Sequence, residues 1–347
     1  MDFRDTPEYH GSTEVGLSSG LIGMSTIMFG LRIFVRLFVT KSFGLDDGLT
    51  VVAYLALMVL TVMDISAVSL GSGTHISYVP EDILYRFFEL LSIQSILYFW
   101  VMALVRFAIL AFIPRIVQDK IINRISWAVA AIIAAQTIGA TVYRLTECIP
   151  FGDNFKSPDT PGLHCVGLKA HNGMMMGHGV IGIIVDMILL ILPIWIICTK
   201  MIWSKKTLQI VLVLSIGVFA IATAIIRVAL LAAIYLPIDL TWMMPFLTIW
   251  SGLEAHVGMW CCCFPALQPI LRTMAPNKTR AVSAIYNNSS HTRYKPGTQD
   301  NSNSTRKECE TNASRHYEML NGSQRTIILP EKRQEDATRG GRDASPV

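Results

Sequence analysis

Residues 208–235 have the sequence LQIVLVLSIGVFAIATAIIRVALLAAIY, in which Arg227 is the only charged side chain. A helix of about 20 predominantly apolar residues crosses the hydrocarbon core of a bilayer, which is about 30 Å thick. A helix also satisfies its backbone hydrogen bonds within one segment, which lipid requires. The stretch therefore predicts a transmembrane helix.

The rest of the chain repeats this pattern. Comparable apolar runs cover approximately residues 15–38, 47–70, 86–113, 125–143, 172–198 and 243–268. Of the 347 residues, 52% are hydrophobic and 16% are charged, whereas soluble domains carry about 25% charged residues. Residues 15–272 are therefore predicted to form an all-α membrane protein, a bundle of seven transmembrane helices. The composition excludes a soluble enzyme, a nucleic-acid-binding protein and a secreted disulfide scaffold.

The charges of the connecting loops predict the orientation. The first, third and fifth loops carry basic residues, Lys41 and Lys120 among them, whereas the second carries Glu81 and Asp82. Lys and Arg are retained on the cytoplasmic side of a membrane, so the odd-numbered loops are expected inside. The short N-terminus, residues 1–14, is then extracellular and the C-terminus is cytoplasmic. The predicted location is a plasma membrane or an endomembrane, with the lipid bilayer as a partner.

From residue 273 onward the sequence is rich in Asn, Ser, Thr, Arg and Glu, and apolar runs almost disappear. Such a segment cannot bury enough apolar surface to offset the conformational entropy that folding costs. Residues 273–347 are therefore predicted to be a disordered cytoplasmic tail. Six Asn-x-Ser/Thr sequons in it would fit a lumenal location if they carried glycans, but an Asn- and Ser-rich segment also forms sequons by chance.

Several short motifs follow one another through the predicted bundle. They are Leu31-Arg-Ile-Phe-Val-Arg36, Phe43-Gly-Leu-Asp-Asp47, Gly71-Ser-Gly-Thr-His75, Cys148-x-Pro150 with Cys165, Asp186 before Leu192-Pro-Ile194, Gly217-Val-Phe with Arg227, Asp239-Leu-Thr-Trp242, Ile249-Trp-Ser251, Glu254 and Pro265. Over about residues 30–272 this order resembles the fungal rhodopsin-like integral membrane proteins, a family with satratoxin-cluster and Pth-eleven-related receptor-like types. The resemblance implies the seven-helix fold and the same topology.

The resemblance implies an activity less directly than a fold. Members look like orphan receptors in some settings and like products of mycotoxin gene clusters in others. We expect a receptor-like protein that senses a small, lipophilic molecule and signals to a cytoplasmic partner. The alternatives are a membrane-embedded enzyme or accessory protein of fungal secondary metabolism and, third, a small-molecule transporter. An enzyme ranks below a receptor, since no Walker or HExxH motif is present.

No cofactor is expected. A retinal Schiff base would need a lysine amine within a span, and every lysine lies in a predicted loop or in the tail, from Lys41 onward. No metal site is predicted either.

Charged residues inside the predicted spans are the strongest indication of a functional site, because each costs about 2.5–3.5 kcal/mol or more at the membrane centre. Those in the outer half or near the middle are expected to line a ligand pocket with two tryptophans. The predicted pocket residues are Asp64, Glu89, Asp186, Arg227, Trp242, Trp250 and Glu254. Arg227 is expected to pair with Asp186 or Glu254. The alternatives are a structural ionic lock and, in an enzyme, a catalytic acid at Asp186 or Glu254.

A second set of charges is expected toward the cytoplasmic side. It consists of Arg32, Arg36, Asp46, Asp47 and Arg106. Carboxylates at the start of a helix complement its dipole, so one interpretation is capping and anchoring of the second span. The functional interpretation is a switch, in which these pairs exchange when an outside ligand favours a second arrangement of the helices.

Cys148 and Cys165 share the predicted exterior loop between the fourth and fifth spans, where oxidation is permitted. A disulfide there would stabilise the fold by about 3 kcal/mol through chain entropy, and the alternative is two free thiols. Cys261-Cys-Cys263 lies in the inner half of the last span. These cysteines are expected to pack in the core, with palmitoylation as the alternative.

Overall fold

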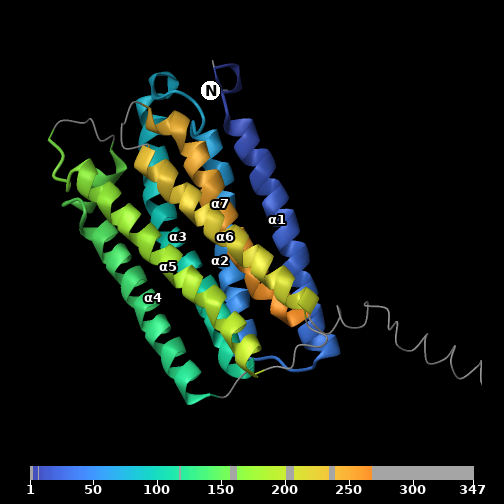
Figure 1. Ribbon diagram of the computed structural model, residues 1–347. Coiled ribbons are helices and arrows are strands. Elements are labelled where there is room, and N and C mark those ends of the chain that lie inside the picture. Colours follow the sequence, from blue (N-terminus) through green and yellow to red (C-terminus); the bar gives the residue numbers. More distant parts are fainter. Residues whose placement is uncertain are drawn as a thin grey trace, which may run out of the picture. The chain divides into compact units, whose positions relative to one another are not determined.

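The computed structural model describes residues 3–6, 8–116, 119–156, 162–200, 207–233 and 239–267. Within these ranges the chain forms helices and no strand. The long helices are α1 (Gly11–Phe34), α2 (Leu45–Ser69), α3 (Glu81–Ile116), α4 (Lys120–Thr146), α5 (Leu168–Lys200), α6 (Thr207–Ala233) and α7 (Leu240–Cys263) (Figure 1). A π-helical turn at Val35–Val39 and 3₁₀ turns at Phe3–Asp5, Ile76–Tyr78, Phe151–Phe155 and Phe264–Leu267 complete the described elements. The predicted all-α, seven-helix fold is confirmed.

Helices α3 and α7 have the largest number of neighbours in this bundle. α3 packs against α2, α4, α5 and α7, and α7 packs against α1, α2, α3 and α6. Figure 1 shows the long helices side by side, with α4 and α5 at one edge and α1 at the other. Charged side chains on α3 or α7 can therefore meet partners from most of the bundle.

Six of the described helices are long and apolar enough to cross a membrane. The seventh, α7, is less apolar because it contains Pro245, Glu254 and His256. Its consecutive residues Glu254, Ala255, His256 and Val257 are all buried, so neighbouring helices cover every side of α7 at this point. A helix shielded in this way needs no apolar surface toward lipid. The chain is thus a multi-pass integral membrane protein; its orientation stays a prediction.

The apolar core has two main clusters. The first joins α2, α3 and α7 through Leu57, Leu60, Phe99, Val105 and Met259. The second joins α3, α4 and α5 through Leu110, Ile113, Ile122, Val129 and Val185. Large apolar side chains also face outward, including Ile27, Val62, Trp127, Ile138 and Ile191. A bilayer solvates such side chains, whereas water would not, so the outer face fits contact with lipid.

The helix boundaries differ from the predicted spans by up to five residues, and two of the differences concern acidic segments. α3 begins at Glu81, earlier than the predicted residue 86, because Glu81 and Asp82 in its first turn stabilise the helix N-terminus. α1 begins at Gly11, inside the predicted N-terminal segment of residues 1–14. The predicted tail, residues 273–347, lies outside the described residues.

The loop between α4 and α5 contains the predicted disulfide, Cys148–Cys165. Backbone hydrogen bonds from Ile149 N to His164 O (3.0 Å) and from Val166 N to Glu147 O (2.8 Å) pair the two chain segments beside it. The covalent bond and these contacts together close the loop.

Replacing both bridge cysteines, Cys148→Ser with Cys165→Ser, is expected to lower the free energy of unfolding by about 3 kcal/mol, because the open loop gains chain entropy in the unfolded state. Thermal unfolding of the detergent-solubilised protein measures this change. A reductant should lower the unfolding midpoint of the wild type and leave the double variant unchanged. Equal midpoints for the oxidised wild type and the variant would contradict the prediction.

Candidate functional site

Arg106 and Asp186 form the first of two ion pairs inside the bundle. Arg106 on α3 donates from Nε and Nη2 to the two carboxylate oxygens of Asp186 on α5, both at 2.9 Å. This parallel pair of hydrogen bonds is the arrangement in which a guanidinium and a carboxylate match best. Arg106 is almost fully buried, so the pair fixes α3 to α5 within the protein.

Glu254 on α7 is the carboxylate of the second ion pair. Its Oε2 accepts from Arg227 Nε on α6 at 2.6 Å and from the Tyr98 hydroxyl on α3 at 3.1 Å. The Arg227 guanidinium also lies 5.2 Å from the centroid of the Tyr98 ring, within the range of a cation–π contact. Glu254 Oε1 lies 3.8 Å from Arg106 Nη2. We call these five residues, Tyr98, Arg106, Asp186, Arg227 and Glu254, the central network.

The charges of the central network balance, with two guanidinium groups against two carboxylates. The side chains of Arg106 and Arg227 are each 5% exposed, and that of Glu254 is 3% exposed. Removing one partner of a buried pair leaves an uncompensated charge, which typically costs about 3–5 kcal/mol. The central network therefore holds α3, α5, α6 and α7 in one arrangement.

Two glycines on α5 make room for the arginines of the central network. A Cβ atom at Gly182 would lie 2.8 Å from Arg106 Nη2, and one at Gly179 would lie 2.6 Å from Val228 Cγ2 and 3.2 Å from Arg227 Nη2. These distances are shorter than ordinary van der Waals contacts, so a side chain at Gly182 displaces the Arg106 guanidinium, and one at Gly179 displaces Val228 and crowds Arg227. The close approach explains why α5 carries glycines here, although glycine is a poor helix former.

The variant Gly182→Ala is expected to displace Arg106 from Asp186 and to destabilise the protein by about 1–3 kcal/mol, a typical cost of overpacking. Gly177→Ala on the same helix is the matched control, because a Cβ there meets nothing within 4 Å. Comparing the unfolding midpoints of the two variants tests the assignment. Equal midpoints would show that the guanidinium moves aside without cost.

Three of the predicted pocket residues lie in the central network. Arg227 pairs with Glu254, which is one of the two partners predicted for it, and Asp186 pairs with Arg106. From the sequence, Arg106 was grouped with the charges around Arg32. The contacts of Arg106 correct that grouping, because α3 passes through the interior of the bundle and places the guanidinium beside Asp186 and Glu254. Tyr98 was not identified from the sequence, since it lies within an uninterrupted apolar run.

The other predicted pocket residues lie elsewhere. Asp64 on α2 accepts a hydrogen bond from Gln94 on α3. Glu89 is half-buried on α3, and its carboxyl group forms no hydrogen bond or ion pair with a described residue. Trp250 is half-buried on α7. Within the described residues, no group of three or more His, Cys, Asp or Glu side chains is placed to hold a metal ion.

Trp242 lies at the start of α7, where the N-terminal segment and the loop between α2 and α3 meet. Its ring stacks on His75 at 5.3 Å and contacts the His10 ring at 5.4 Å. Its Nε1 donates to the carbonyl of Glu8 at 3.1 Å, and His75 Nδ1 lies 2.6 Å from Asp239 Oδ2. These contacts cover this end of α7 with residues from two distant parts of the chain.

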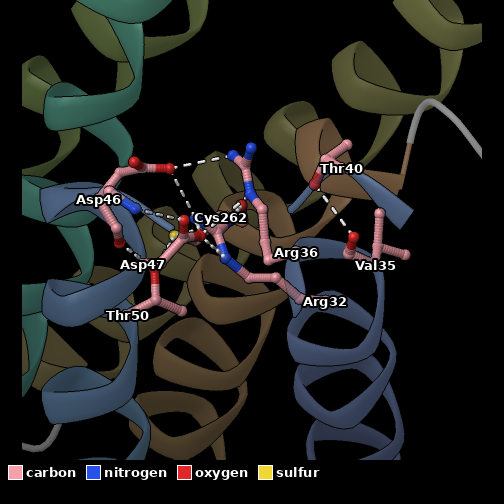
Figure 2. A network of polar contacts seen from close by, with 9 residues as sticks. Arg32, Val35, Arg36, Thr40, Asp46, Asp47, Thr50 and Cys262 are labelled. Atoms are coloured by element: carbon pink, nitrogen blue, oxygen red, sulfur yellow. Dashed lines mark hydrogen bonds and ion pairs between the residues drawn. The ribbon is translucent and has the colours of Figure 1, made fainter. Parts of the chain in front are cut away.

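A second group of charges joins α1, the start of α2 and the end of α7, and Figure 2 shows it. The fully buried Arg32 contacts Asp46 Oδ2 at 3.0 Å and Asp47 Oδ1 at 2.8 Å through Nη2. Its Nη1 donates to the backbone carbonyl of Cys262 on α7 at 2.5 Å. Arg36 lies 3.1 Å from each aspartate, through Nη2 to Asp46 and through Nε to Asp47. We call Arg32, Arg36, Asp46 and Asp47 the arginine–aspartate cluster.

The arginine–aspartate cluster also caps and anchors its helices. Asp47 Oδ2 accepts from the backbone N of Gly44 at 3.1 Å, which satisfies a donor at the start of α2. On the other side, Thr40 N and Oγ1 contact the carbonyl of Val35 at 2.9 and 3.0 Å (Figure 2), closing the wide π-helical turn after α1. The contacts therefore include both the cap at the start of α2 and the ion pairs that anchor α2 to α1. The switch stays a prediction.

The variant Arg32→Ala is expected to lower the free energy of unfolding by about 3–5 kcal/mol, because it leaves two buried aspartates with one arginine. Arg86→Ala removes an exposed arginine from α3 and serves as the control, with an expected change near zero. Thermal unfolding in detergent measures both variants. An Arg32→Ala midpoint equal to that of the control would contradict the anchoring role.

Glu147 follows the last turn of α4, beside the disulfide. Its Oε1 lies 2.6 Å from His171 Nδ1, and its Oε2 pairs with Arg144. Burial opposes the charged carboxylate, but the hydrogen bond from His171 and the charge of Arg144 outweigh it and lower the pKa of Glu147 below its usual value. The stabilisation that follows is present above the unfolded-state pKa and is lost as the pH falls through the folded-state pKa.

Comparisons with known proteins place this arrangement in a family. The model of the fungal rhodopsin domain matches residues 31–273, a range that includes the central network and the arginine–aspartate cluster. No curated protein and no solved structure matches the chain. The matched range covers most of the chain and agrees with the described seven-helix bundle. The chain therefore belongs to the fungal rhodopsin domain family and is a receptor-like, multi-pass membrane protein.

Proposed function

We propose that this protein is a receptor for a small, lipophilic molecule and that the central network transmits the signal. The observation that carries the proposal is the 3.8 Å separation of Arg106 Nη2 from Glu254 Oε1. Arg106 is bound to Asp186 on α5 and at the same time faces a second carboxylate on α7. One guanidinium thus has two alternative acceptors on two helices.

An exchange of partners at Arg106 would provide the two states that signalling requires. In the described state Asp186 holds Arg106, while Arg227 and Tyr98 hold Glu254. Moving Arg106 toward Glu254 would loosen the contact between α3 and α5 and tighten that between α3 and α7. The guanidinium stays paired throughout, and the carboxylate that it leaves, Asp186, is 17% exposed against 3% for Glu254, so an unpaired charge costs less there than at a fully buried carboxylate. A ligand that binds one state better shifts the population toward it.

Helix α7 connects the central network to the arginine–aspartate cluster. Glu254 lies in the network, and the Cys262 carbonyl, about two turns further along α7, accepts a hydrogen bond from Arg32. A displacement of α7 at Glu254 therefore reaches Arg32 through one rigid helix. In this proposal the ligand site lies beside Asp186, Arg227 and Glu254, and a cytoplasmic signalling partner responds at the arginine–aspartate cluster.

The proposed receptor works without retinal, although the family name contains the word rhodopsin. A Schiff base needs a lysine that reaches the interior of the bundle. The lysines of the described helices, Lys120, Lys169 and Lys200, stand at or next to helix ends. Arg106 and Arg227 occupy the interior instead, and a guanidinium cannot form this linkage.

Catalysis by Asp186 or Glu254 is less well supported. A general acid must be able to reach the atom that it protonates. Both carboxylates accept hydrogen bonds from buried arginines, so donors of the chain itself already occupy their oxygens. The contacts therefore support signalling by rearranged ion pairs better than they support proton transfer.

The test compares fungal strains in which the gene carries Arg106→Lys, Arg227→Gln or, as a control, Arg86→Gln, after equal protein levels in the membrane have been verified. Arg106→Lys keeps the charge but cannot form the parallel pair of hydrogen bonds with Asp186. Untargeted metabolite profiles of cells and medium are recorded over time. We expect unchanged products with altered timing or inducibility in the first two strains and no change in the control.

Other outcomes would overturn the receptor proposal. A single lost product with an accumulated precursor would indicate an enzyme or accessory protein of a biosynthetic pathway. A product that stays in the cells but disappears from the medium would indicate a transporter. Wild-type behaviour of both network variants would remove the central network from the function.

A further inference from the structure

His256 on α7 is a fully buried histidine, and both of its ring nitrogens have a hydrogen-bond partner. Nδ1 lies 2.7 Å from Ser25 Oγ on α1, and Nε2 lies 3.0 Å from Thr61 Oγ1 on α2. At one end Trp260 Nε1 donates to Ser25 Oγ at 2.8 Å, and at the other Thr61 Oγ1 donates to the Leu57 carbonyl at 2.8 Å. We call these five residues the histidine bridge.

The first end of the histidine bridge determines the state of Nδ1. An indole N–H only donates, whereas a serine hydroxyl accepts and also has one proton to donate. Ser25 Oγ accepts from Trp260, and among the described residues the acceptor for its own proton is His256 Nδ1. Nδ1 therefore accepts a hydrogen bond, and it carries no proton.

The other end determines the state of Nε2. The Thr61 hydroxyl also has one proton, which it donates to the Leu57 carbonyl on the same helix. Toward His256 it can then only accept, so Nε2 carries the ring proton. With the proton on Nδ1 instead, the buried Ser25 proton would have no acceptor among the described residues, and an unpaired buried donor is costly.

The ring of His256 is neutral. An imidazolium in the interior would need a carboxylate as its partner, and none of the ion pairs between described residues includes His256. Four hydrogen bonds thus run in one direction along the histidine bridge, from Trp260 to the Leu57 carbonyl. Hydrogen bonds aligned in this way polarise and strengthen one another.

Glu254 of the central network lies two residues before His256 on α7. Successive residues of an α-helix are rotated by about 100°, so residues two apart point to nearly opposite sides. His256 faces α1 and α2 through the histidine bridge. Glu254 faces α3 and α6, where it accepts from Tyr98 and Arg227. One rotation of α7 about its axis therefore satisfies both sets of contacts.

We propose that His256, neutral and with its proton on Nε2, is a positioning residue of the central network. It does not touch the network; its bonds to α1 and α2 fix the rotation of α7 and so direct Glu254 toward its partners on α3 and α6. When Arg106 exchanges partners, α1, α2 and α7 then move as one unit. This role in signalling rests on the proposed function, whereas the protonation of the ring and its effect on Glu254 are testable without a ligand.

The first test is magnetic resonance of the full-length protein in lipid bilayers, with ¹⁵N-labelled histidine. The signals that disappear in His256→Gln belong to His256. We expect a protonated Nε2 and an unprotonated Nδ1. Thr61→Val should shift the Nε2 resonance and Ser25→Ala the Nδ1 resonance, whereas Thr146→Val, at an exposed position on α4, should shift neither. A proton on Nδ1, or on both nitrogens, would overturn the proposal.

The second test is a double-mutant cycle between His256→Leu and Glu254→Gln, measured as midpoints of thermal unfolding in detergent. The two side chains do not share a partner, so a merely structural role of His256 predicts additive losses. If His256 directs Glu254, the double variant loses less than the sum of the single losses, because Glu254 is already displaced in His256→Leu. Additive losses would overturn the positioning role. If His256→Leu fails to fold, Thr61→Val replaces it in the cycle.

His256→Gln is the matched conservative variant. Its amide donates through Nε2 and accepts through Oε1, so it can replace both ring nitrogens, and its losses with Glu254→Gln should be additive. In the fungus, at equal protein levels, His256→Leu is expected to alter the timing of metabolites as Arg106→Lys does, and His256→Gln should retain the wild-type timing.

The strains separate the two proposals. Altered timing in Arg106→Lys but wild-type timing in His256→Leu would remove His256 from the signal. Wild-type timing in both strains, together with the expected spectra and a non-additive cycle, would overturn the receptor function and leave the positioning of Glu254 by His256 in place.

Discussion

The fold depends on one constraint: a charge in the interior of a membrane bundle has to be neutralised by a partner, because lipid offers it no solvation. Arg106, Arg227 and Arg32 satisfy this constraint with carboxylates from other helices. Each such pair fixes the rotation and the depth of two helices at once, which apolar packing alone does only loosely. The helices are therefore ordered by a few pairs of charges, and the apolar side chains fill the space between them.

The fold followed from the sequence because the signal for it is long and local. Apolar runs of spanning length mark the helices, and the bounds of α6 (Thr207–Ala233) almost coincide with the run at residues 208–235. Errors arose where polar residues belong to a helix. Glu81 and Asp82 looked like a loop but form the first turn of α3. The span of α7, by contrast, was predicted correctly, although it contains Glu254 and His256, which neighbouring helices bury.

The composition of the central network was predicted better than its pairing. Asp186, Arg227 and Glu254 were identified because charges inside spans are rare and costly. Their partners were ambiguous, since a helix that is apolar all round gives no periodic stripe from which its rotation can be inferred. For the same reason Arg106 was grouped with the wrong charges and Tyr98 was overlooked. Glu14 lay in a segment assigned to the extracellular N-terminus, so its burial against Ser72 could not be foreseen.

The contact between α1 and α7 has a consequence for the biogenesis of the protein. Arg32 meets Asp46 and Asp47, which follow it by 14 and 15 residues, so α1 and α2 can leave the translocon as a hairpin whose charges are already neutralised. Ser25 binds His256, and Arg32 also binds the Cys262 carbonyl, and both contacts wait until the ribosome has passed α7. A chain arrested before that point keeps an insertable hairpin but lacks the helix that closes the bundle.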